Sequence, residues 1–195
     1  MIETEVLSQL SKKLFDKKLN KFAKLFGKPL IQKRASVSLS SYETKVDTRI
    51  KITNGKVHIV QKTGGELSQF LVRKEIDIDL NVSLDDLVSV IRMLQNIGKH
   101  LEGFTSHLQQ FENSLFKIPD GEIKMYYQFG KSDFYGFELE VNEGVDIHAK
   151  LNDLGLKVDD IERSNKYWRD YDERINLNCF EMSDKELKEI LKKYL

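Results

Sequence analysis

The sequence is short of the residues that cross-link or interrupt a chain. Cys179 is the only cysteine among 195 residues, which excludes an intrachain disulfide and is typical of a reducing compartment. Pro29 and Pro119 are the only prolines, and no linker-like segment is present, so we expect one domain over residues 1–195. No apolar run approaches the roughly 18 residues of a membrane span, and the opening Met-Ile-Glu-Thr-Glu is unlike a signal peptide. We therefore expect a cytoplasmic protein without a membrane partner.

An excess of one charge is also missing. The 31 basic residues balance the 31 acidic ones, so bulk charge does not indicate a broad surface for nucleic acid or membrane. The hydrophobic fraction of 40% is normal for a globular protein with a core. Functional information must therefore lie in how acids and bases are sorted along the chain.

Hydrophobic periodicity predicts the α+β class, with strands and helices that alternate in groups. Alternation with a period of two predicts strands at about 2–7, 35–40, 45–53, 56–62, 70–80, 107–118, 122–129 and 134–142. Helical spacing and capping residues predict helices at about 8–26, 83–98, 146–154, 158–174 and 184–194. Asn54-Gly55 predicts a tight hairpin, and Gly64-Gly65 predicts another turn. The helices from about residue 158 form a C-terminal extension.

Charged residues recur at every second position of the predicted strands. Because strand side chains alternate between two faces, these charges share one face of each strand. They are Glu3, Glu5, Asp47, Arg49, Lys51, Lys62, Arg73, Glu75, Asp77, Asp79, Glu138 and Glu140. A half-exposed antiparallel sheet also has a polar face, but such a face usually mixes Ser, Thr, Gln and Lys. Here it carries doubled carboxylates and doubled bases.

Such faces would converge if the sheet curled into a barrel. Clustered carboxylates repel one another unless a cation binds them, and clustered Arg and Lys favour phosphate. A cavity with both groups suits a polyphosphate that is held through a divalent metal.

The run from Asp47 to Lys62, followed by Arg73-Lys-Glu-Ile-Asp77, resembles the CYTH domain of the triphosphate tunnel metalloenzymes. The resemblance extends over about residues 2–157 and includes Gly-Phe-Glu-Leu-Glu at 136–140. It implies a closed antiparallel β-barrel of about eight strands that encloses a tunnel, with flanking helices. It also implies Mg²⁺ or Mn²⁺ as cofactor and a triphosphate-containing substrate.

The same resemblance implies roles by position. The carboxylates that would hold the metal are Glu3, Glu5, Glu75, Asp77, Glu138 and Glu140. The bases that would bind phosphate are Arg49, Lys51, Lys62 and Arg73. Leu7 stands where the family has a lysine, residues 107–111 (His-Leu-Gln-Gln-Phe) lack the usual base, and the aspartate expected near Lys124–Gln128 is absent. No catalytic acid or base is assigned.

Several functions remain open at this point. The leading hypothesis is a metal-dependent triphosphatase for inorganic, nucleoside or thiamine triphosphate. A class IV-type adenylyl cyclase would use the same charges to bind ATP. A non-catalytic module would bind polyphosphate or a triphosphorylated RNA 5′ end, and a plain half-exposed sheet would have no pocket. The sequence also leaves open whether the chain is a monomer or a homodimer.

Overall fold

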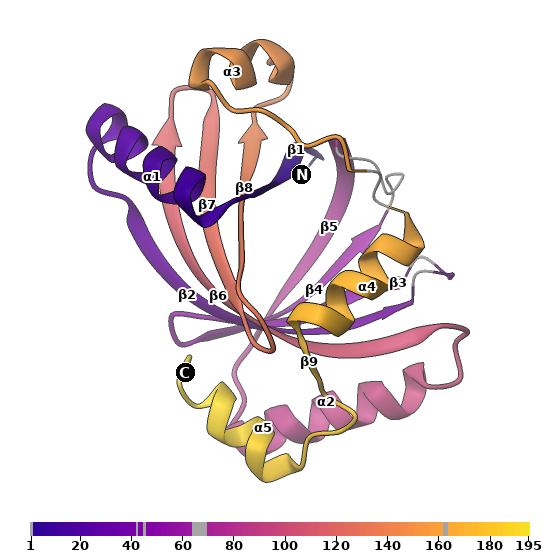
Figure 1. The fold of residues 1–195 in the computed structure, drawn as a ribbon. Coiled ribbons are helices and arrows are strands. Elements are labelled where there is room, and N and C mark those ends of the chain that lie inside the picture. Colours follow the sequence, from indigo (N-terminus) through magenta and orange to yellow (C-terminus); the bar gives the residue numbers. More distant parts are fainter. Residues whose placement is uncertain (1, 42, 45, 64–69, 162–163) are drawn as a thin grey trace.

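A computed structural model describes residues 2–41, 43–44, 46–63, 70–161 and 164–195 (Figure 1), with side chains at all of these except 2–4, 46, 62–63 and 70–75. The strands are β1 (Ile2–Leu10), β2 (Leu30–Ser41), β3 (Val46–Thr53), β4 (Lys56–Thr63), β5 (Phe70–Leu80), β6 (Phe104–Ile118), β7 (Gly121–Phe129), β8 (Phe134–Val141) and β9 (Leu177–Asn178). The helices are α1 (Lys12–Phe26), α2 (Leu84–Gly98), α3 (Ile147–Leu154), α4 (Asn165–Ile175) and α5 (Asp184–Leu191).

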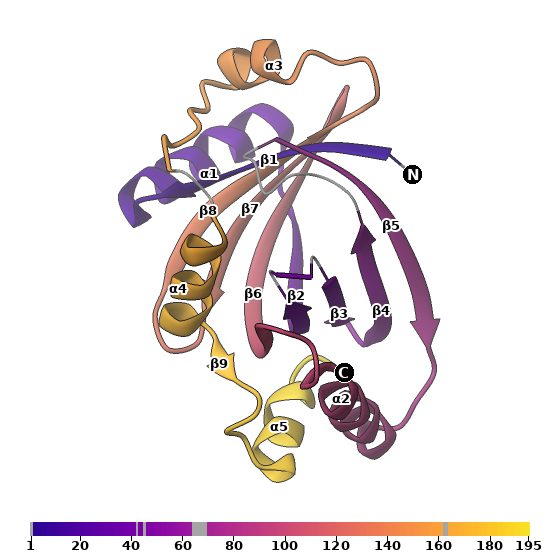
Figure 2. The same cartoon turned by 90° about the vertical axis from the view of Figure 1, so that its right-hand side faces the viewer.

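The strands form one antiparallel sheet in the order β2-β3-β4-β5-β1-β8-β7-β6-β9. In addition, β2 pairs with β6 from Leu30↔Leu115 to Ser41↔Phe104. Each strand from β1 to β8 therefore has at least two hydrogen-bonded neighbours, and Figure 2 shows these strands curving around a common interior. The predicted α+β class is confirmed.

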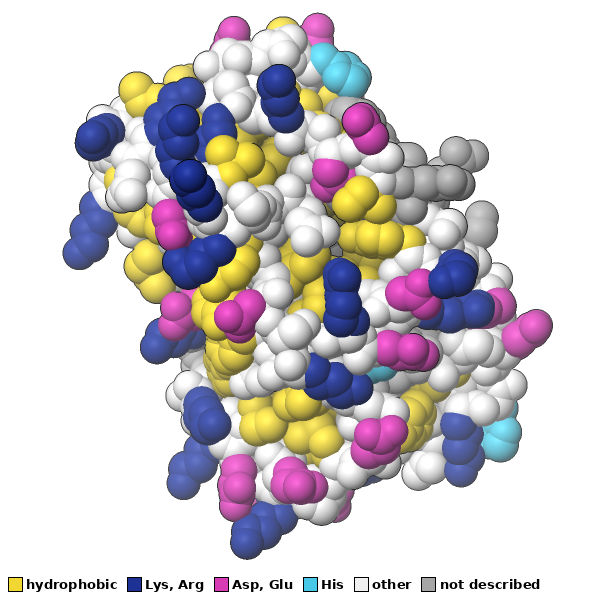
Figure 3. Space-filling model, viewed as in Figure 1, with side chains coloured by type: hydrophobic (Ala, Val, Ile, Leu, Met, Phe, Trp, Pro, Cys, Tyr) yellow, Lys and Arg dark blue, Asp and Glu magenta, His cyan; other side chains and the backbone are white. Residues whose placement is uncertain are grey.

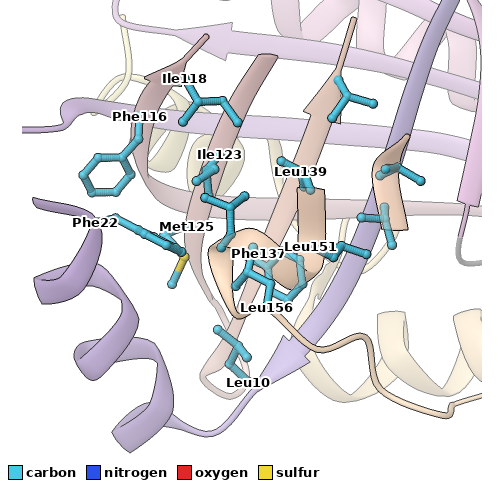
Figure 4. Packing of buried hydrophobic residues seen from close by; sticks show 14 of the residues in the cluster. Leu10, Phe22, Phe116, Ile118, Ile123, Met125, Phe137, Leu139, Leu151 and Leu156 are labelled. Atoms are coloured by element: carbon cyan, nitrogen blue, oxygen red, sulfur yellow. The ribbon is translucent and has the colours of Figure 1, made fainter. Parts of the chain in front are cut away.

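The apolar side of the curved sheet is its outside, where α1, α2, α3 and α5 lie. One cluster joins α1 and α3 to β6, β7 and β8, with Phe22 against Phe116 at a ring-centroid distance of 5.9 Å (Figure 4). A second cluster joins α2 and α5 to β2, β3 and β4 through residues such as Leu87, Ile52 and Leu187. Because strand side chains alternate, this outer packing turns the charged positions inward.

Local turn chemistry follows the sequence. Asn54 and Gly55 both have positive φ, 48° and 84°, as the predicted two-residue hairpin requires. Ser83 caps α2 by accepting a hydrogen bond from the Asp86 N–H, and Gly155 ends α3 in the left-handed conformation. The turn predicted at 64–65 lies outside the described residues.

Two predicted helix starts were wrong. The first helix begins at Lys12 rather than at 8, because β1 continues to Leu10, which pairs with Tyr135, and Ser11 supplies the cap. The helix predicted from 158 begins only at Asn165. Before it, the Asp159 carboxylate accepts hydrogen bonds from the Ser8 hydroxyl (2.9 Å) and the Gln9 N–H (2.7 Å), which holds this segment against β1.

Basic residues are clustered on one part of the outer surface. Helix α1 carries six lysines and a single acid, Asp16, and dark blue side chains gather over it in Figure 3. The zero net charge therefore hides local sorting. Within the described ranges, no helix has the length and hydropathy that are needed to cross a membrane.

Candidate active site

The inner face of the curved sheet, opposite the helix-packed side, carries most of the predicted site. Strand register brings polar residues from all eight strands β1 to β8 to this face. Those with described side chains include Glu5, Arg34, Ser36, Ser38, Asp47, Arg49, Lys51, His58, Asp77, Asp79, His107, Gln109, Lys124, Gln128, Glu138 and Glu140. Charges that are spread over 136 positions of sequence thus share one surface.

Three predicted metal ligands lie together. Glu5 on β1 is the register partner of Glu140 on β8, and Glu138 lies two residues away on the same face. One carboxylate oxygen from each of the three residues lies within 4.8 Å of the others. Glu5 is only 4% exposed. We call these three residues the glutamate group.

Lys124 on β7 is the counter-ion of the glutamate group. Its Nζ lies 2.5 Å from Glu138 Oε1 and 3.7 Å from Glu140 Oε1, and the side chain is only 13% exposed. Burial lowers the pKa of Lys124, but Glu138 and Glu140 outweigh burial and the repulsion of Arg34, so the pKa lies above its usual value. Lys124 is therefore charged at neutral pH.

The glutamate group fits a hard divalent cation. Three carboxylates face one ammonium group, and Mg²⁺ and Mn²⁺ prefer such oxygen ligands. No role was predicted for Lys124 from the sequence. The only available signal was its place in the strand alternation, because positions 122, 124 and 126 alternate with the buried Ile123 and Met125 of β7.

Lys124 also bears on the missing family lysine at Leu7. Glu138 has two register partners, Leu7 on β1 and Lys124 on β7. The lysine that is absent from one neighbour of Glu138 is thus present on the other. Glu138 therefore has a cation beside it on β7, whereas the CYTH-like resemblance predicts one at position 7 of β1.

Two of the four predicted phosphate-binding bases, Arg49 and Lys51, lie on β3. The Arg49 guanidinium donates two hydrogen bonds to Asp47, from Nε at 2.8 Å and from Nη2 at 2.9 Å. Asp47 and Arg49 are two residues apart and therefore share a face, so Asp47 holds the planar fork of Arg49 in one orientation. Lys51 is half-buried on the same face.

A second acidic group lies apart from the first. His58 Nδ1 is 3.0 Å from Asp77 Oδ1 and 2.8 Å from Asp79 Oδ1, and we call these residues the His58 group. The β5 partner of Glu5 is Leu71, and Asp77 lies six residues further along β5. That separation is about 20 Å along the strand. The structure therefore brings Glu5, Glu138 and Glu140 together and places Asp77 elsewhere.

Four predicted site residues have side chains outside the described part of the protein. They are Glu3, Lys62, Arg73 and Glu75. Their backbones pair across the sheet, Glu3 with Arg73 and Lys62 with Glu75. Their roles remain predictions from the resemblance.

The C-terminal extension contributes a buried polar network to the inner face. The Tyr171 hydroxyl donates to Gln128, the Gln128 amide donates to Asn176 (2.5 Å), and the Asn176 amide donates to Asp172 (2.6 Å). His107 Nδ1 lies 3.5 Å from Asp172. Burial lowers the pKa of His107, although Asp172 opposes this shift.

Aromatic rings accompany this network. Tyr171 packs edge-on against Phe134 of β8 at 4.9 Å, and Phe134 stacks on Tyr126 of β7 at 6.1 Å. Helix α4 therefore covers part of the inner face. The sequence predicted a helix in this region but gave no signal of where it would pack.

Solved structures share this fold across most of the chain. The PH1012 protein of Pyrococcus horikoshii has a TM-score of 0.61 at 18% identity, covering 89% of this chain and 99% of its own. A proposed adenylate cyclase of Bacillus halodurans has 0.59 at 14% identity, covering 86% and 96%. HpAC1 of Hippeastrum, a proposed adenylyl cyclase with a dominant triphosphatase activity, has 0.57 at 12% identity, covering 93% and 100%.

No family model and no curated protein matches the sequence. The structural likenesses confirm the CYTH-like resemblance at the level of the fold. At identities of 12–18% they show the fold alone.

Proposed function

We propose that this protein is a metal-dependent triphosphatase whose strands β1 to β8 form a closed barrel around a charged tunnel. The observation that carries the proposal is the glutamate group beside Lys124. Three carboxylates gather on an inner face that also carries the oriented Arg49. A solvated sheet surface has no need to bury Glu5 among other acids.

Each part of the site has a distinct task. Glu5, Glu138 and Glu140 would hold Mg²⁺ or Mn²⁺, which when bound supplies charge stabilisation and a positioned water. Arg49 and Lys51 hold the phosphate oxygens and offset their negative charge. Lys124 limits repulsion among the carboxylates, and Asp47 keeps Arg49 oriented.

Lys62, Arg73, Glu3 and Glu75 complete the site in this proposal by their positions in the CYTH-like pattern. Their strands adjoin β3 and β1, and Lys62 and Glu75 are register partners. They extend the same alternation of acids and bases around the tunnel.

Two observations favour hydrolysis over the alternatives. The structural relative HpAC1 has a dominant triphosphatase activity although it was proposed to be a cyclase. In addition, Lys124 keeps a cation at Glu138 despite Leu7, so the altered motif does not by itself indicate a binding-only module. An adenylyl cyclase remains the second candidate because other relatives of this fold are proposed cyclases.

The test is a phosphate-release screen with Mg²⁺ or Mn²⁺ on inorganic triphosphate, ATP, thiamine triphosphate and 5′-triphosphorylated RNA. Cyclic AMP is measured in the ATP reactions. We expect metal-dependent phosphate release that Glu138→Gln lowers at limiting metal concentration and that the matched control Glu143→Gln, on an exposed loop, preserves. Cyclic AMP with pyrophosphate would identify a cyclase. Tight binding without turnover would identify a binding module, and neither binding nor turnover would refute the proposal.

A further inference from the structure

Ser36 Oγ and Gln109 Oε1 are among the buried inner-face atoms that have no hydrogen-bonding partner within the described part of the chain. Ser36 on β2 is 2% exposed and Gln109 on β6 is 8% exposed. Such atoms are rare in folded proteins because burial without a partner is unfavourable, and each one needs an explanation.

The neighbouring Gln110 gives a useful contrast. It is equally buried, but it lies on the outer face, where Gln110 Oε1 accepts a hydrogen bond from the Tyr194 hydroxyl at 3.1 Å. Among the described residues, the glutamine on the packed face therefore has a partner and Gln109 Oε1 has none. The difference points to a ligand on the inner face.

Ser36 and Gln109 lie beside a predicted phosphate-binding base. Ser36 is the register partner of Lys51 on one side and of Gln109 on the other. These three residues therefore form one row across β3, β2 and β6. Residues 104–115 of β6 contain no Lys or Arg. The row thus passes from a cation to neutral hydrogen-bonding groups.

An aromatic ring follows Gln109 on the same face. Phe111 is two residues further along β6, with the Arg34 guanidinium 4.9 Å from its ring centroid. Tyr126 contacts the same ring edge-on at 6.4 Å. A hydroxyl, an amide and an aromatic ring are the groups that recognise a flat heterocycle.

We propose that Ser36 and Gln109 form a subsite for the non-phosphate part of an organic triphosphate, of the nucleoside type, whose phosphates lie toward Lys51. This inference rests on the proposed function. Phosphate oxygens only accept hydrogen bonds, so they cannot satisfy Gln109 Oε1. The amide needs both a donor and an acceptor whichever way its two ends are assigned. The edge of a nucleobase offers both, and inorganic triphosphate does not.

The test compares two ligands on the full-length chain by calorimetry with Mg²⁺, using a non-hydrolysable ATP analogue and inorganic triphosphate. Gln109→Leu keeps a similar volume but removes both polar functions. We expect it to weaken binding of the ATP analogue at least about tenfold and that of inorganic triphosphate less than about twofold. Ser36→Ala should weaken binding of the ATP analogue by about threefold. The control Gln61→Leu, at an exposed position, should change neither ligand.

A second measurement guards against misfolding. Because Gln109→Leu replaces a buried amide whose Oε1 has no partner within the described part of the chain, the melting temperature of the ligand-free protein should be unchanged or higher. A lower melting temperature would show that Gln109 is a structural residue and would overturn the inference.

The outcomes separate this inference from the proposed function. If Gln109→Leu weakens both ligands equally, or if the wild type binds inorganic triphosphate as tightly as the ATP analogue, the subsite is refuted while the triphosphatase stands. If the wild type binds neither ligand, both proposals fail. A cyclase result leaves the subsite intact, because a cyclase must also bind the nucleoside.

Discussion

The glutamate group and the His58 group begin from the same sequence pattern and end in different environments. Both come from carboxylates two residues apart in a strand, Glu138 with Glu140 and Asp77 with Asp79. The Glu138 side chain is 13% exposed and contacts Lys124, whereas the Asp79 side chain is 88% exposed and contacts His58. Alternating acids thus become a compensated buried site in one place and a solvated surface group in the other.

The difference shows why burial matters more than the motif. Water screens the His58 group, so the contacts of His58 with Asp77 and Asp79 contribute little to stability. In the glutamate group water is largely replaced by protein, so every unbalanced charge is costly and a bound cation is strongly favoured. Substitutions in the glutamate group should therefore change stability more than substitutions in the His58 group.

Removing the counter-ion should have the largest effect. Lys124→Met keeps the length of the side chain but removes the ammonium group that contacts Glu138 and Glu140. We expect the free energy of unfolding in urea without metal to fall by about 3–5 kcal/mol, the cost of breaking a buried ion pair. Added Mg²⁺ should recover part of this loss. The control Lys117→Met, whose side chain is 85% exposed, should change stability by less than about 1 kcal/mol.

Removing a phosphate-binding base should weaken ligand binding rather than the fold. Arg49→Ala should reduce triphosphate affinity by about 1.5–3 kcal/mol, the scale of a charge-assisted hydrogen bond. Calorimetry with inorganic triphosphate and Mg²⁺ measures this loss. The comparison variant is Arg169→Ala. Arg169 lies on α4, is partly exposed and, like Arg49, contacts a carboxylate, that of Glu43. Equal affinities for Arg49→Ala and wild type would contradict a phosphate role for Arg49.

Neutralising one glutamate should act on metal binding first. Glu138→Gln should raise the Mg²⁺ or Mn²⁺ concentration for half-maximal activity by about tenfold or more. It should also lower the stability of the metal-free protein by about 1–2 kcal/mol, because Lys124 loses its contact at 2.5 Å while Glu140 remains. An unchanged metal requirement would remove Glu138 from the site.

The pH dependence of stability has a definite sign. Lys124 has a raised pKa in the folded protein, because Glu138 and Glu140 outweigh its burial. Its contribution is therefore complete below the unfolded pKa of about 10.4 and is lost as pH rises through the folded value. The stability difference between wild type and Lys124→Met should shrink in this alkaline range and stay constant from about pH 7 to 9. Urea unfolding across this series measures the difference.

The exposed group should give the smallest effect. Asp79→Asn removes one of the two carboxylates that contact His58, and its solvated environment limits the change in stability to less than about 0.5 kcal/mol. The metal requirement for activity should not move. A shift in the metal requirement as large as that of Glu138→Gln would show that the two groups act as one site.

Much of the fold could be predicted because it depends on local chemistry. The α+β class, the Asn54-Gly55 hairpin, the Ser83 cap and the strand positions all follow from nearby residues. The face shared by Arg49 and Lys51 follows from the period of a strand. The start of α1 was missed because β1 continues through Ser8–Leu10 by pairing with β8, a strand about 130 residues away in sequence.

Local sequence sets which residues share a face of each strand, because side-chain alternation depends only on neighbouring positions. Which strands pair, and in which register, depends on the tertiary structure. It joined Glu5 to Glu140 and Lys124 to Glu138, and it set Asp77 apart with His58. It also left Gln109 facing inward while Gln110 found Tyr194. Register between distant strands is fixed by the packing of the whole sheet and its helices, and no local pattern contains it.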